Sequence, residues 1–294
     1  MQHKRVLIAG ARGLLGTPTT SRFRRVDGVD VLALDLPEFD ITDSAQVTPR
    51  LDDFRPDLVV NCAAYTAVDE CERKETLACR VNGDGAGIIA RASADIGARF
   101  IHISTDYVFG GDATEPIPED SATGSPERLS AHGRSKLLGE QRVAASHPGA
   151  LIVRTAWLYG PDGKCFPDSI LRAAEKEPRL RVVNDQTGSP TYAPDLADAL
   201  WELGRLDLTG IVHVTNSGCC TWYDFAREIL RLSRIDAPIT PVMSAEFPRP
   251  AKRPGYSVLD NRRYVEAVGR PLRHWQDAAA EYVAARAEAH GSSV

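Results

Sequence analysis

The sequence lacks the features that mark secreted, membrane-spanning or disulfide-stabilised proteins. Its six cysteines (62, 71, 79, 165, 219 and 220) form no C-x-x-C pair, so we expect reduced thiols and a cytoplasmic location. No apolar run approaches the roughly 20 residues that a membrane-spanning helix requires. The first predicted strand begins shortly after Met1, so we expect no secretion signal.

An excess of charge of one sign is also missing. The 294 residues carry a formal net charge of −5, with 43% hydrophobic and 26% charged residues. This balance is ordinary for a globular protein and gives no reason to expect nucleic acid or a membrane surface as a partner. There is no internal repeat, and the acidic residues are too scattered to predict a metal site. The length suffices for one large α/β domain and a smaller lobe.

The stretch from Lys4 to Gly16 has the pattern of a strand, a glycine-rich turn and a helix, K-R-V-L-I-A-G-A-R-G-L-L-G. Gly10 permits a turn that other residues would strain, Gly13 lets the backbone approach a pyrophosphate, and Gly16 lets the helix pack close to the strand. The amides and dipole at the start of that helix favour an anion. We therefore predict a bound dinucleotide, which the same turn also contacts through Arg12, Leu14 and Leu15.

The second predicted strand (29–34) ends at Asp35, where dinucleotide folds hydrogen-bond the adenosine ribose. This acid favours NAD(H), whereas Arg12 could offset the 2′-phosphate of NADP(H), so the sequence leaves both cofactors open. The next loop contains Asp40 and Ile41. For this loop, capping of the following helix by Thr42 or Asp43 and contact with the adenine are equally good interpretations.

The third predicted strand (56–63) runs into small residues and one tyrosine: Cys62, Ala63, Ala64 and Tyr65. Small residues at the carboxyl end of a strand leave space for a cofactor to cross the sheet edge; tight packing against a helix is the alternative. After this segment we expect one long amphipathic helix over 75–97. Asn82 lies midway along it and is expected to be solvated, with a position under the cofactor as the alternative.

Polar residues follow the fourth predicted strand (99–104): Thr105, Asp106 and Tyr107. Hydroxyls at this edge of a parallel sheet lie where substrate meets nicotinamide. A loop over 111–130 then precedes a helix predicted over 131–146. In that helix His132 and Lys136 are four residues apart and therefore share a face.

Six motifs occur in order along the chain: G-A-R-G-L-L-G, N-C-A-A-Y-T-A-V-D, S-T-D-Y-V-F, H-G-R-S-K-L-L-G-E, N-D-Q-T-G-S-P-T and R-P-G-Y-S-V-L-D. Together they resemble the dTDP-4-dehydrorhamnose reductases, a family of extended short-chain dehydrogenase/reductases. The resemblance covers nearly the whole chain. It implies a Rossmann-type doubly wound parallel sheet, mainly residues 1–160, and a smaller substrate lobe, mainly 161–294, with segments near 192–215 returning to the first domain. It also implies hydride transfer from NADPH or NADH to the C4 ketone of a nucleotide-linked 4-keto-6-deoxyhexose, with dTDP as the expected nucleotide.

One position departs from the family signature Tyr-x-x-x-Lys, because His132 stands where the tyrosine is expected. Lys136 is kept, and Thr105 matches the hydroxyl that helps to bind the carbonyl. A free imidazole has a pKa of ~6.5, and a nearby lysine favours its neutral form, which can still donate one N–H. The sequence leaves open reduction with His132 as donor, reduction with Tyr107 or a water as the acid, a non-catalytic regulatory homologue, and altered nucleotide-sugar chemistry.

Substrate contacts are predicted in the C-terminal part. The resemblance places Trp222 nearest the substrate, and Trp157 ends a strand predicted over 150–157. Lys252 and Arg253 belong to a basic, proline-rich stretch that suits a diphosphate, with a solvated loop as the alternative. Arg154 lies within an apolar run, so it must be paired or face a cleft. The sequence leaves open whether the protein is a homodimer.

Overall fold

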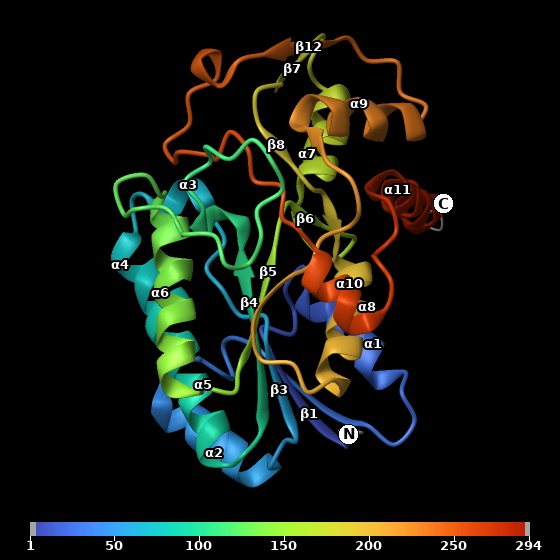
Figure 1. Cartoon of the computed structure of the whole chain (residues 1–294). Coiled ribbons are helices and arrows are strands. Elements are labelled where there is room, and N and C mark those ends of the chain that lie inside the picture. Colours follow the sequence, from blue (N-terminus) through green and yellow to red (C-terminus); the bar gives the residue numbers. More distant parts are fainter. Residues whose placement is uncertain (1–3, 292–294) are drawn as a thin grey trace.

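The centre of the computed structural model, which describes residues 4–291, is a six-stranded parallel sheet (Figure 1). Its strands are β1 (Arg5–Ala9), β2 (Asp30–Leu34), β3 (Leu58–Asn61), β4 (Arg99–Thr105), β5 (Leu151–Thr155) and β10 (Gly210–His213). They lie in the order β10, β5, β4, β3, β1, β2, and every pair is parallel. The chain reverses its direction across the sheet between β1 and β3, the position at which such sheets bind ligands. The predicted doubly wound α/β fold is confirmed.

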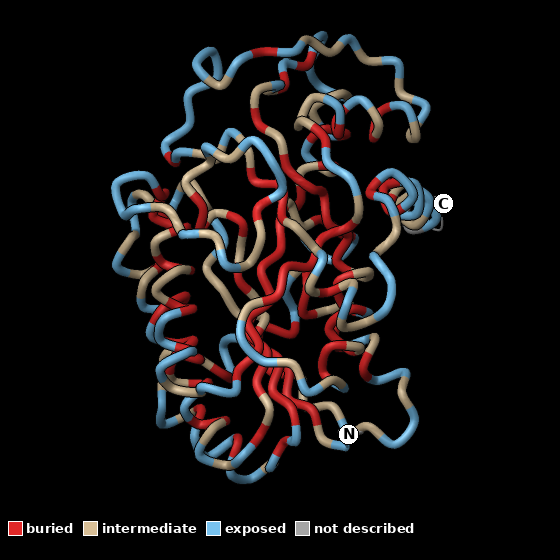
Figure 2. The backbone as a smooth tube through the Cα atoms, in the orientation of Figure 1, coloured by how far each residue is buried: buried red, intermediate tan, exposed pale blue. Residues whose placement is uncertain are grey.

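Helices cover both faces of this sheet (Figure 1). One face carries α1 (Gly16–Arg24), α8 (Ala193–Arg205) and α10 (Arg262–Val268), and the other carries α2 (Ser44–Phe54), α5 (Ala86–Asp95) and α6 (Ala131–Ser146). Alternate residues of β1 serve the two cores, Val6 and Ile8 on one face and Leu7 and Ala9 on the other, as the two-residue period of a strand requires. Figure 2 shows that burial is concentrated in these strands.

The helix expected over 75–97 forms as one unbroken helical run over 75–95, but its middle part is π-helical rather than α-helical. The structure has α4 (Glu75–Ala78), then the π-helical stretch η1 (Cys79–Gly85), and then α5. Asn82 is 1% exposed rather than solvated. Its side chain accepts from the amide of Tyr65 at 2.7 Å and donates to the carbonyl of Tyr65 at 3.0 Å and to the hydroxyl of Ser135 at 2.9 Å. These hydrogen bonds of Asn82 lie within the π-helical stretch η1. Single π-helical turns of this kind often occur at functional sites.

A smaller lobe lies above the carboxyl ends of the strands (Figure 1). Its core contains aromatic side chains that include Tyr159, Phe225, Trp275 and Tyr282. The helices of this part are α7 (Phe166–Ala174), α9 (Trp222–Leu232), α11 (Trp275–Gly291) and the short η3 (Ser244–Glu246). Its strands form three pairs: β6 (Leu158–Tyr159) with β9 (Thr191–Tyr192), β7 (Leu180–Val183) with β12 (Ile239–Val242), and β8 (Thr187–Gly188) with β11 (Cys220–Thr221).

Polar side chains cap the starts of two helices. Asp43, rather than Thr42, caps α2 by accepting a hydrogen bond from the amide of Ala45 at 2.9 Å. Thr221 caps α9 and forms a reciprocal capping box with Asp224. Both side chains accept hydrogen bonds from backbone amides in the first helical turn, which have no carbonyl partner within the helix.

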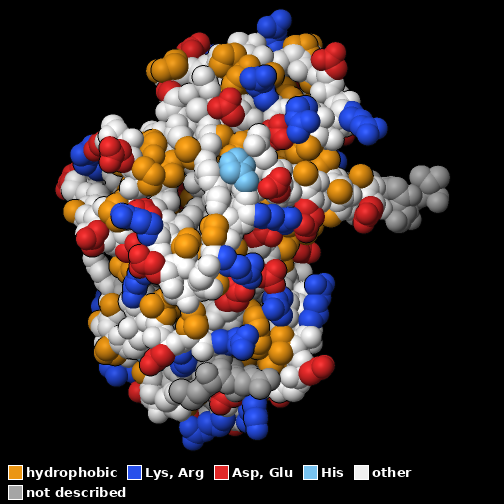
Figure 3. Space-filling view, turned by 45° about the vertical axis from the view of Figure 1, so that its right-hand side comes forward, with side chains coloured by type: hydrophobic (Ala, Val, Ile, Leu, Met, Phe, Trp, Pro, Cys, Tyr) orange, Lys and Arg blue, Asp and Glu red, His pale blue; other side chains and the backbone are white. Residues whose placement is uncertain are grey.

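The surface mixes charges of both signs. Figure 3 shows acidic and basic side chains interspersed over one face of the molecule, as expected from the small net charge of −5. Within residues 4–291, no helix combines the length and the apolar character needed to cross a membrane.

Candidate active site

The glycine turn after β1 packs against the backbone that follows β3. Gly10 has a φ of +72°, a conformation that residues with a side chain rarely adopt. A Cβ at Gly10 would lie 2.5 Å from the amide nitrogen of Ala63, and a Cβ at Gly16 would collide with the carbonyl of Gly10. Both positions therefore need glycine for steric reasons.

The first turn of α1 presents its amides without competition from a capping side chain. Leu15 is its N-cap and makes no side-chain capping hydrogen bond. Leu15 is buried in the core, while Leu14 lies beside Gly160 and Gly163. An uncapped helix start that follows a glycine turn fits a pyrophosphate held by backbone amides.

Asp35 lies beside this turn at the end of β2. Its carboxylate accepts hydrogen bonds from the amides of Arg12 and Leu36, both at 2.7 Å. The guanidinium of Arg12 points away from Asp35, to the carbonyl of Leu36 at 2.9 Å and to both oxygens of Glu38 at 3.0 Å. A cavity of about 600 Å³ begins beside this turn at Arg12 and Asp35 and extends along α1 to Arg25.

The remaining predicted cofactor contacts lie in two loops. Asp40 accepts a hydrogen bond from the amide of Thr42 at 2.8 Å, which is a local turn, and Ile41 is 4% exposed and packs in the core. Ile41 could thus meet a ligand mainly through its backbone. In the second loop, Cys62, Ala63, Ala64 and Tyr65 are all partly exposed. Burial raises the pKa of the Cys62 thiol to about 12, which makes it an uncharged neighbour at physiological pH.

Thr105, Asp106 and Tyr107 leave β4 and enter the short helix η2 (Asp106–Val108). The Thr105 hydroxyl donates to Asp106 Oδ1 at 3.0 Å and accepts from the amide of Tyr107 at 3.2 Å. Asp106 is 1% exposed, and burial raises its pKa to about 6. The three residues therefore form one rigid corner at the sheet edge.

The first turn of α6 brings His132 to this corner. Ser130 caps the helix by accepting from the amide of Gly133 at 3.2 Å. A Cβ at Gly133 would collide with the carbonyl of Tyr107, so glycine allows α6 to approach η2 closely. The His132 ring lies edge-on to the Tyr107 ring at a centroid distance of 5.5 Å. Its Nδ1 is buried and has no hydrogen-bond partner in the part of the chain that the structure describes.

Lys136 is buried one turn further along α6. Its Nζ donates to the carbonyl of Ile103 at 2.6 Å and lies 3.4 Å from His102 Nε2. Burial lowers the pKa of Lys136 to about 8. Burial, reinforced by the charge of Lys136, lowers the pKa of His132 to about 4. At neutral pH the lysine therefore carries the proton and the histidine is neutral.

Sequence reasoning missed the buried polar groups behind this corner. Asn61 Nδ2 lies 3.2 Å from His102 Nδ1. Glu140 accepts two hydrogen bonds from Arg154, at 2.8 and 2.7 Å, and one from Ser104 at 2.6 Å. Of the two alternatives for Arg154, pairing or facing a cleft, the structure shows pairing. The available signal for His102 was a polar residue within the apolar run R-F-I-H-I-S, which requires a buried partner.

The predicted substrate residues form two groups. Trp157 and Trp222 stack face to face, with centroids 3.5 Å apart and planes 5° apart; Trp157 also packs against a cluster that contains Val108 of η2. Lys252 is exposed. Arg253 donates to both oxygens of Asp69 at 3.0 Å, within α3 (Val68–Cys71), so its stretch is anchored near the Cys62–Tyr65 loop and is not an ordinary solvated loop.

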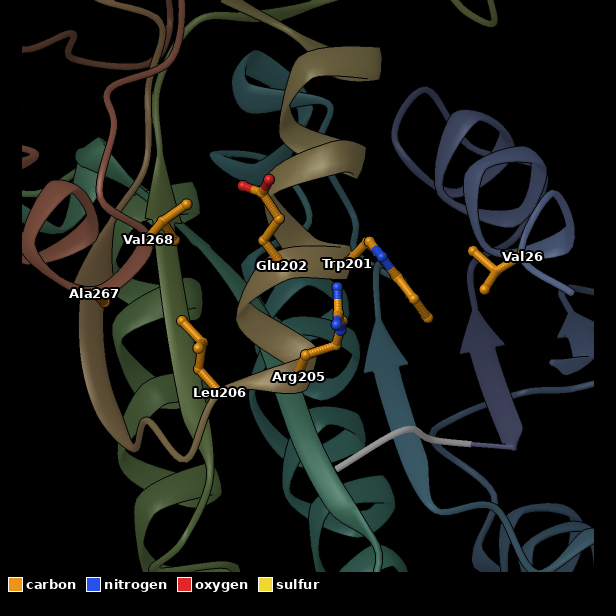
Figure 4. Close-up of a pocket in the computed structure, with 7 residues that line it drawn as sticks. All are labelled: Val26, Trp201, Glu202, Arg205, Leu206, Ala267 and Val268. Atoms are coloured by element: carbon orange, nitrogen blue, oxygen red, sulfur yellow. The ribbon is translucent and has the colours of Figure 1, made fainter. Parts of the chain in front are cut away.

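A larger cavity lies away from every predicted site residue (Figure 4). Its volume is about 740 Å³, and residues of α8 and α10 together with Val26 line it. No set of three or more histidine, cysteine, aspartate or glutamate side chains in residues 4–291 is arranged to hold a metal ion.

Comparison with known proteins gives consistent matches along nearly the whole chain. Residues 4–288 match the family described as the RmlD substrate binding domain. The sequence is 44% identical, over 290 residues, to the dTDP-4-dehydrorhamnose reductase of Mycobacterium tuberculosis, with 97% of this chain and 94% of that protein covered.

Solved structures agree. A crystal structure of a dTDP-4-dehydrorhamnose reductase from Clostridium acetobutylicum superposes with a TM-score of 0.91 at 41% identity, covering 96% of this chain and 99% of that chain. The crystal structure of the Bacillus anthracis dTDP-4-dehydrorhamnose reductase, solved in complex with NADP, also superposes with a TM-score of 0.91. Its identity is 34%, and 97% of this chain and 100% of that chain are covered. On this evidence the chain belongs to the RmlD substrate binding domain family.

Proposed function

We propose that this protein reduces the C4 ketone of a nucleotide-linked 4-keto-6-deoxyhexose, with dTDP as the nucleotide, in deoxysugar biosynthesis. NADPH or NADH supplies the hydride. The observation that carries the proposal is the convergence of Thr105, His132 and Lys136 at the same sheet edge as the glycine turn and Asp35. Relatives that are named dTDP-4-dehydrorhamnose reductase and are over 40% identical support this choice of substrate.

In this proposal the cofactor lies across the β1–β3 crevice. Backbone amides around Leu14 and Leu15, just ahead of α1, hold its pyrophosphate, and Asp35 faces its adenosine ribose. The loops at Asp40–Ile41 and Cys62–Tyr65 border the cofactor, and Lys136 approaches it from α6. These assignments place most of the cofactor contacts in residues 1–160.

The sugar nucleotide lies between this crevice and the smaller lobe. The neutral His132 ring can donate one hydrogen bond to a ketone oxygen. The Thr105 hydroxyl can donate a second once its single O–H turns away from Asp106 Oδ1. Asp106 and Tyr107 shape the wall beside that oxygen, and Trp157 and Trp222 offer an aromatic surface. Lys252 brings positive charge toward the diphosphate, and Arg253, paired with Asp69, holds this stretch beside it.

The test is oxidation of NADPH and of NADH by the purified protein with dTDP-4-keto-6-deoxyhexose generated in place, with and without a 3,5-epimerase. Loss of nicotinamide absorbance should depend on the sugar, and the product should carry a new C4 hydroxyl by NMR. We expect Lys136→Met to lower kcat/KM by about a hundredfold or more.

Lys176→Met is the matched control, because Lys176 is exposed and follows α7 in the smaller lobe; it should leave turnover unchanged. Tight cofactor binding without any sugar-dependent oxidation would contradict the proposal. That result would support a non-catalytic, regulatory homologue instead.

A further inference from the structure

Three buried side chains form a line beneath the proposed reaction centre. Asn61 ends β3, His102 lies within β4, and Lys136 comes from α6. Their exposures are 0%, 0% and 4%. Asn61 Nδ2 is 3.2 Å from His102 Nδ1, and His102 Nε2 is 3.4 Å from Lys136 Nζ.

The direction of the hydrogen bonds along this line follows from one backbone amide. The amide of Ala63, which can only donate, lies 3.1 Å from Asn61 Oδ1. The Asn61 oxygen therefore accepts there, and the amide nitrogen of Asn61 must face the histidine as a donor. His102 Nδ1 consequently accepts. Because burial lowers the pKa of His102 well below its usual value, the ring is neutral and carries its one proton on Nε2.

This tautomer points an N–H at Lys136. An ammonium group offers only N–H donors, so a protonated Lys136 places two donors opposite each other. A neutral amine has a lone pair that can accept from His102 Nε2, while it still donates to the carbonyl of Ile103 at 2.6 Å. The arrangement therefore favours loss of the lysine proton.

Two other titratable groups near Lys136 raise its pKa, but their effect is smaller than that of burial. Glu140, four residues along the same helix, and Cys62, beyond β3, both raise the pKa of Lys136. Glu140 is already paired with Arg154 through two hydrogen bonds, and the Cys62 thiol is uncharged. Burial outweighs both groups and lowers the pKa of Lys136 to about 8. The N–H of His102 that faces Lys136 acts in the same direction as burial.

His132 is a poor source of the proton that reduction requires. Its ring is neutral at neutral pH, because its pKa is lowered to about 4. Loss of the one remaining ring proton would leave an imidazolate anion in a buried site. It can donate a hydrogen bond to the ketone oxygen without giving the proton up.

We propose that Lys136, not His132, gives up the proton that the ketone oxygen takes, and that Asn61 and His102 act as positioning residues that ready the lysine to release it. The inference rests on the proposed function. As the ketone carbon gains hydride, the C=O electron pair moves to oxygen and the oxygen gains a proton. The Lys136 ammonium loses this proton and becomes a neutral amine. The amine takes a proton from solvent after the alcohol is released.

The first test needs neither cofactor nor substrate. Acetic anhydride labels only neutral amines, so its rate of reaction with Lys136, followed by peptide mass spectrometry across pH, reports the protonation of this residue. Exposed Lys176 serves as the internal standard. We expect the labelling midpoint of Lys136 in the wild type to lie about two pH units below the ~10.4 of an ordinary lysine side chain.

Two variants then test the role of the line. His102→Leu removes the Nε2 donor, and Asn61→Asp reverses the hydrogen bond so that His102 Nε2 becomes an acceptor. Each should move the Lys136 midpoint up by about one pH unit. His102→Gln restores an N–H donor and should return the midpoint toward that of the wild type. Cooperative thermal unfolding shows which variants are folded.

Turnover measured on the same proteins tests the proton transfer. The alkaline limb of kcat should move upward in parallel with the labelling midpoint. A midpoint equal to that of Lys176 in the wild type, or unmoved in both variants, would overturn the role of Asn61 and His102. A midpoint that moves without the alkaline limb would overturn Lys136 as the proton source. Labelling that behaves as expected in a protein without turnover would overturn the proposed function instead.

Discussion

At the scale of single residues, His132 is the position where this chain departs from the pattern of its family. A neutral imidazole can hold the ketone oxygen by one hydrogen bond, and that bond should contribute to the rate without setting the pH profile. We expect His132→Phe to lower kcat/KM by about 10- to 100-fold. The alkaline limb should stay in place, because it belongs to Lys136. Steady-state rates across pH measure both effects.

The matched control for this prediction is His147→Phe. His147 follows the other end of α6 and contacts the carbonyl of Ala98 at 2.9 Å, far along the helix from the reaction centre. Its variant should retain the kcat of the wild type. Loss of the alkaline limb in His132→Phe would show that the histidine itself is the titrating acid.

Glu140 is the second residue whose role is open to a direct test. Glu140→Gln should lower the free energy of unfolding by about 3–5 kcal/mol, because it leaves the guanidinium of Arg154 buried beside a neutral amide. Arg154 is 2% exposed, and its Nη1 already has no partner in the described chain. Urea denaturation measures the change.

Asp84→Asn is the control for the buried pair, since Asp84 pairs with Arg142 at 3.6 Å and both side chains are more than half exposed. It should change stability little, because solvent screens the pair. Equal losses of unfolding free energy in the two variants would mean that burial of the Glu140–Arg154 pair does not increase its contribution to stability.

At the scale of elements, the turn between β1 and α1 combines two constraints that can be separated. Gly10 and Gly97 both have a φ of +72°, but a Cβ at Gly10 would strike the Ala63 backbone whereas one at Gly97 would meet nothing within 4 Å. We expect Gly97→Ala to lose about 1–2 kcal/mol of stability through backbone strain alone. Gly10→Ala should lose more, and should also weaken NADPH binding by tenfold or more.

Titration of intrinsic tryptophan fluorescence with NADPH measures this binding. Gly97→Ala should bind the cofactor as the wild type does, because its loop lies at the opposite end of the sheet strands from the glycine turn. Unchanged affinity in Gly10→Ala would exclude the β1–β3 crevice as the cofactor site.

At the scale of the whole molecule, buried neutral histidines make stability depend on pH. Burial lowers the pKa of His132 to about 4 and that of His213 to about 3, against about 6.5 in the unfolded chain. Below that value the unfolded state binds more protons than the folded state, so stability falls with decreasing pH. From pH 7 to pH 5 each histidine should remove about 2 kcal/mol. Asp106, whose pKa is raised to about 6, offsets part of this loss.

Urea denaturation at pH 7 and pH 5 measures this dependence. The loss of stability on acidification should be smaller by about 2 kcal/mol in His132→Phe than in the wild type, because one of the depressed groups is gone. Equal losses in the two proteins would mean that His132 is accessible to protons in the folded state.

The sequence by itself determined the parts of the protein that depend on local pattern. Apolar runs followed by Gly10, by Asp35 and by Thr105 were enough to predict a parallel doubly wound sheet and its ligand edge, because strand period and turn chemistry are encoded within a few residues. The spacing of His132 and Lys136 placed both on one helical face for the same reason. The motifs also sufficed to indicate the family.

Only the tertiary structure decided what depends on residues far apart in the chain. The π-helical turn at Asn82 follows contacts with Tyr65 and Ser135, and Arg253 is anchored by a carboxylate more than a hundred residues away. The surroundings of Lys136, with His102 facing it and Asn61 behind that ring, are built from three separate elements. Burial and hydrogen-bond direction arise when separate elements pack, and for that reason no local pattern in the sequence could predict them.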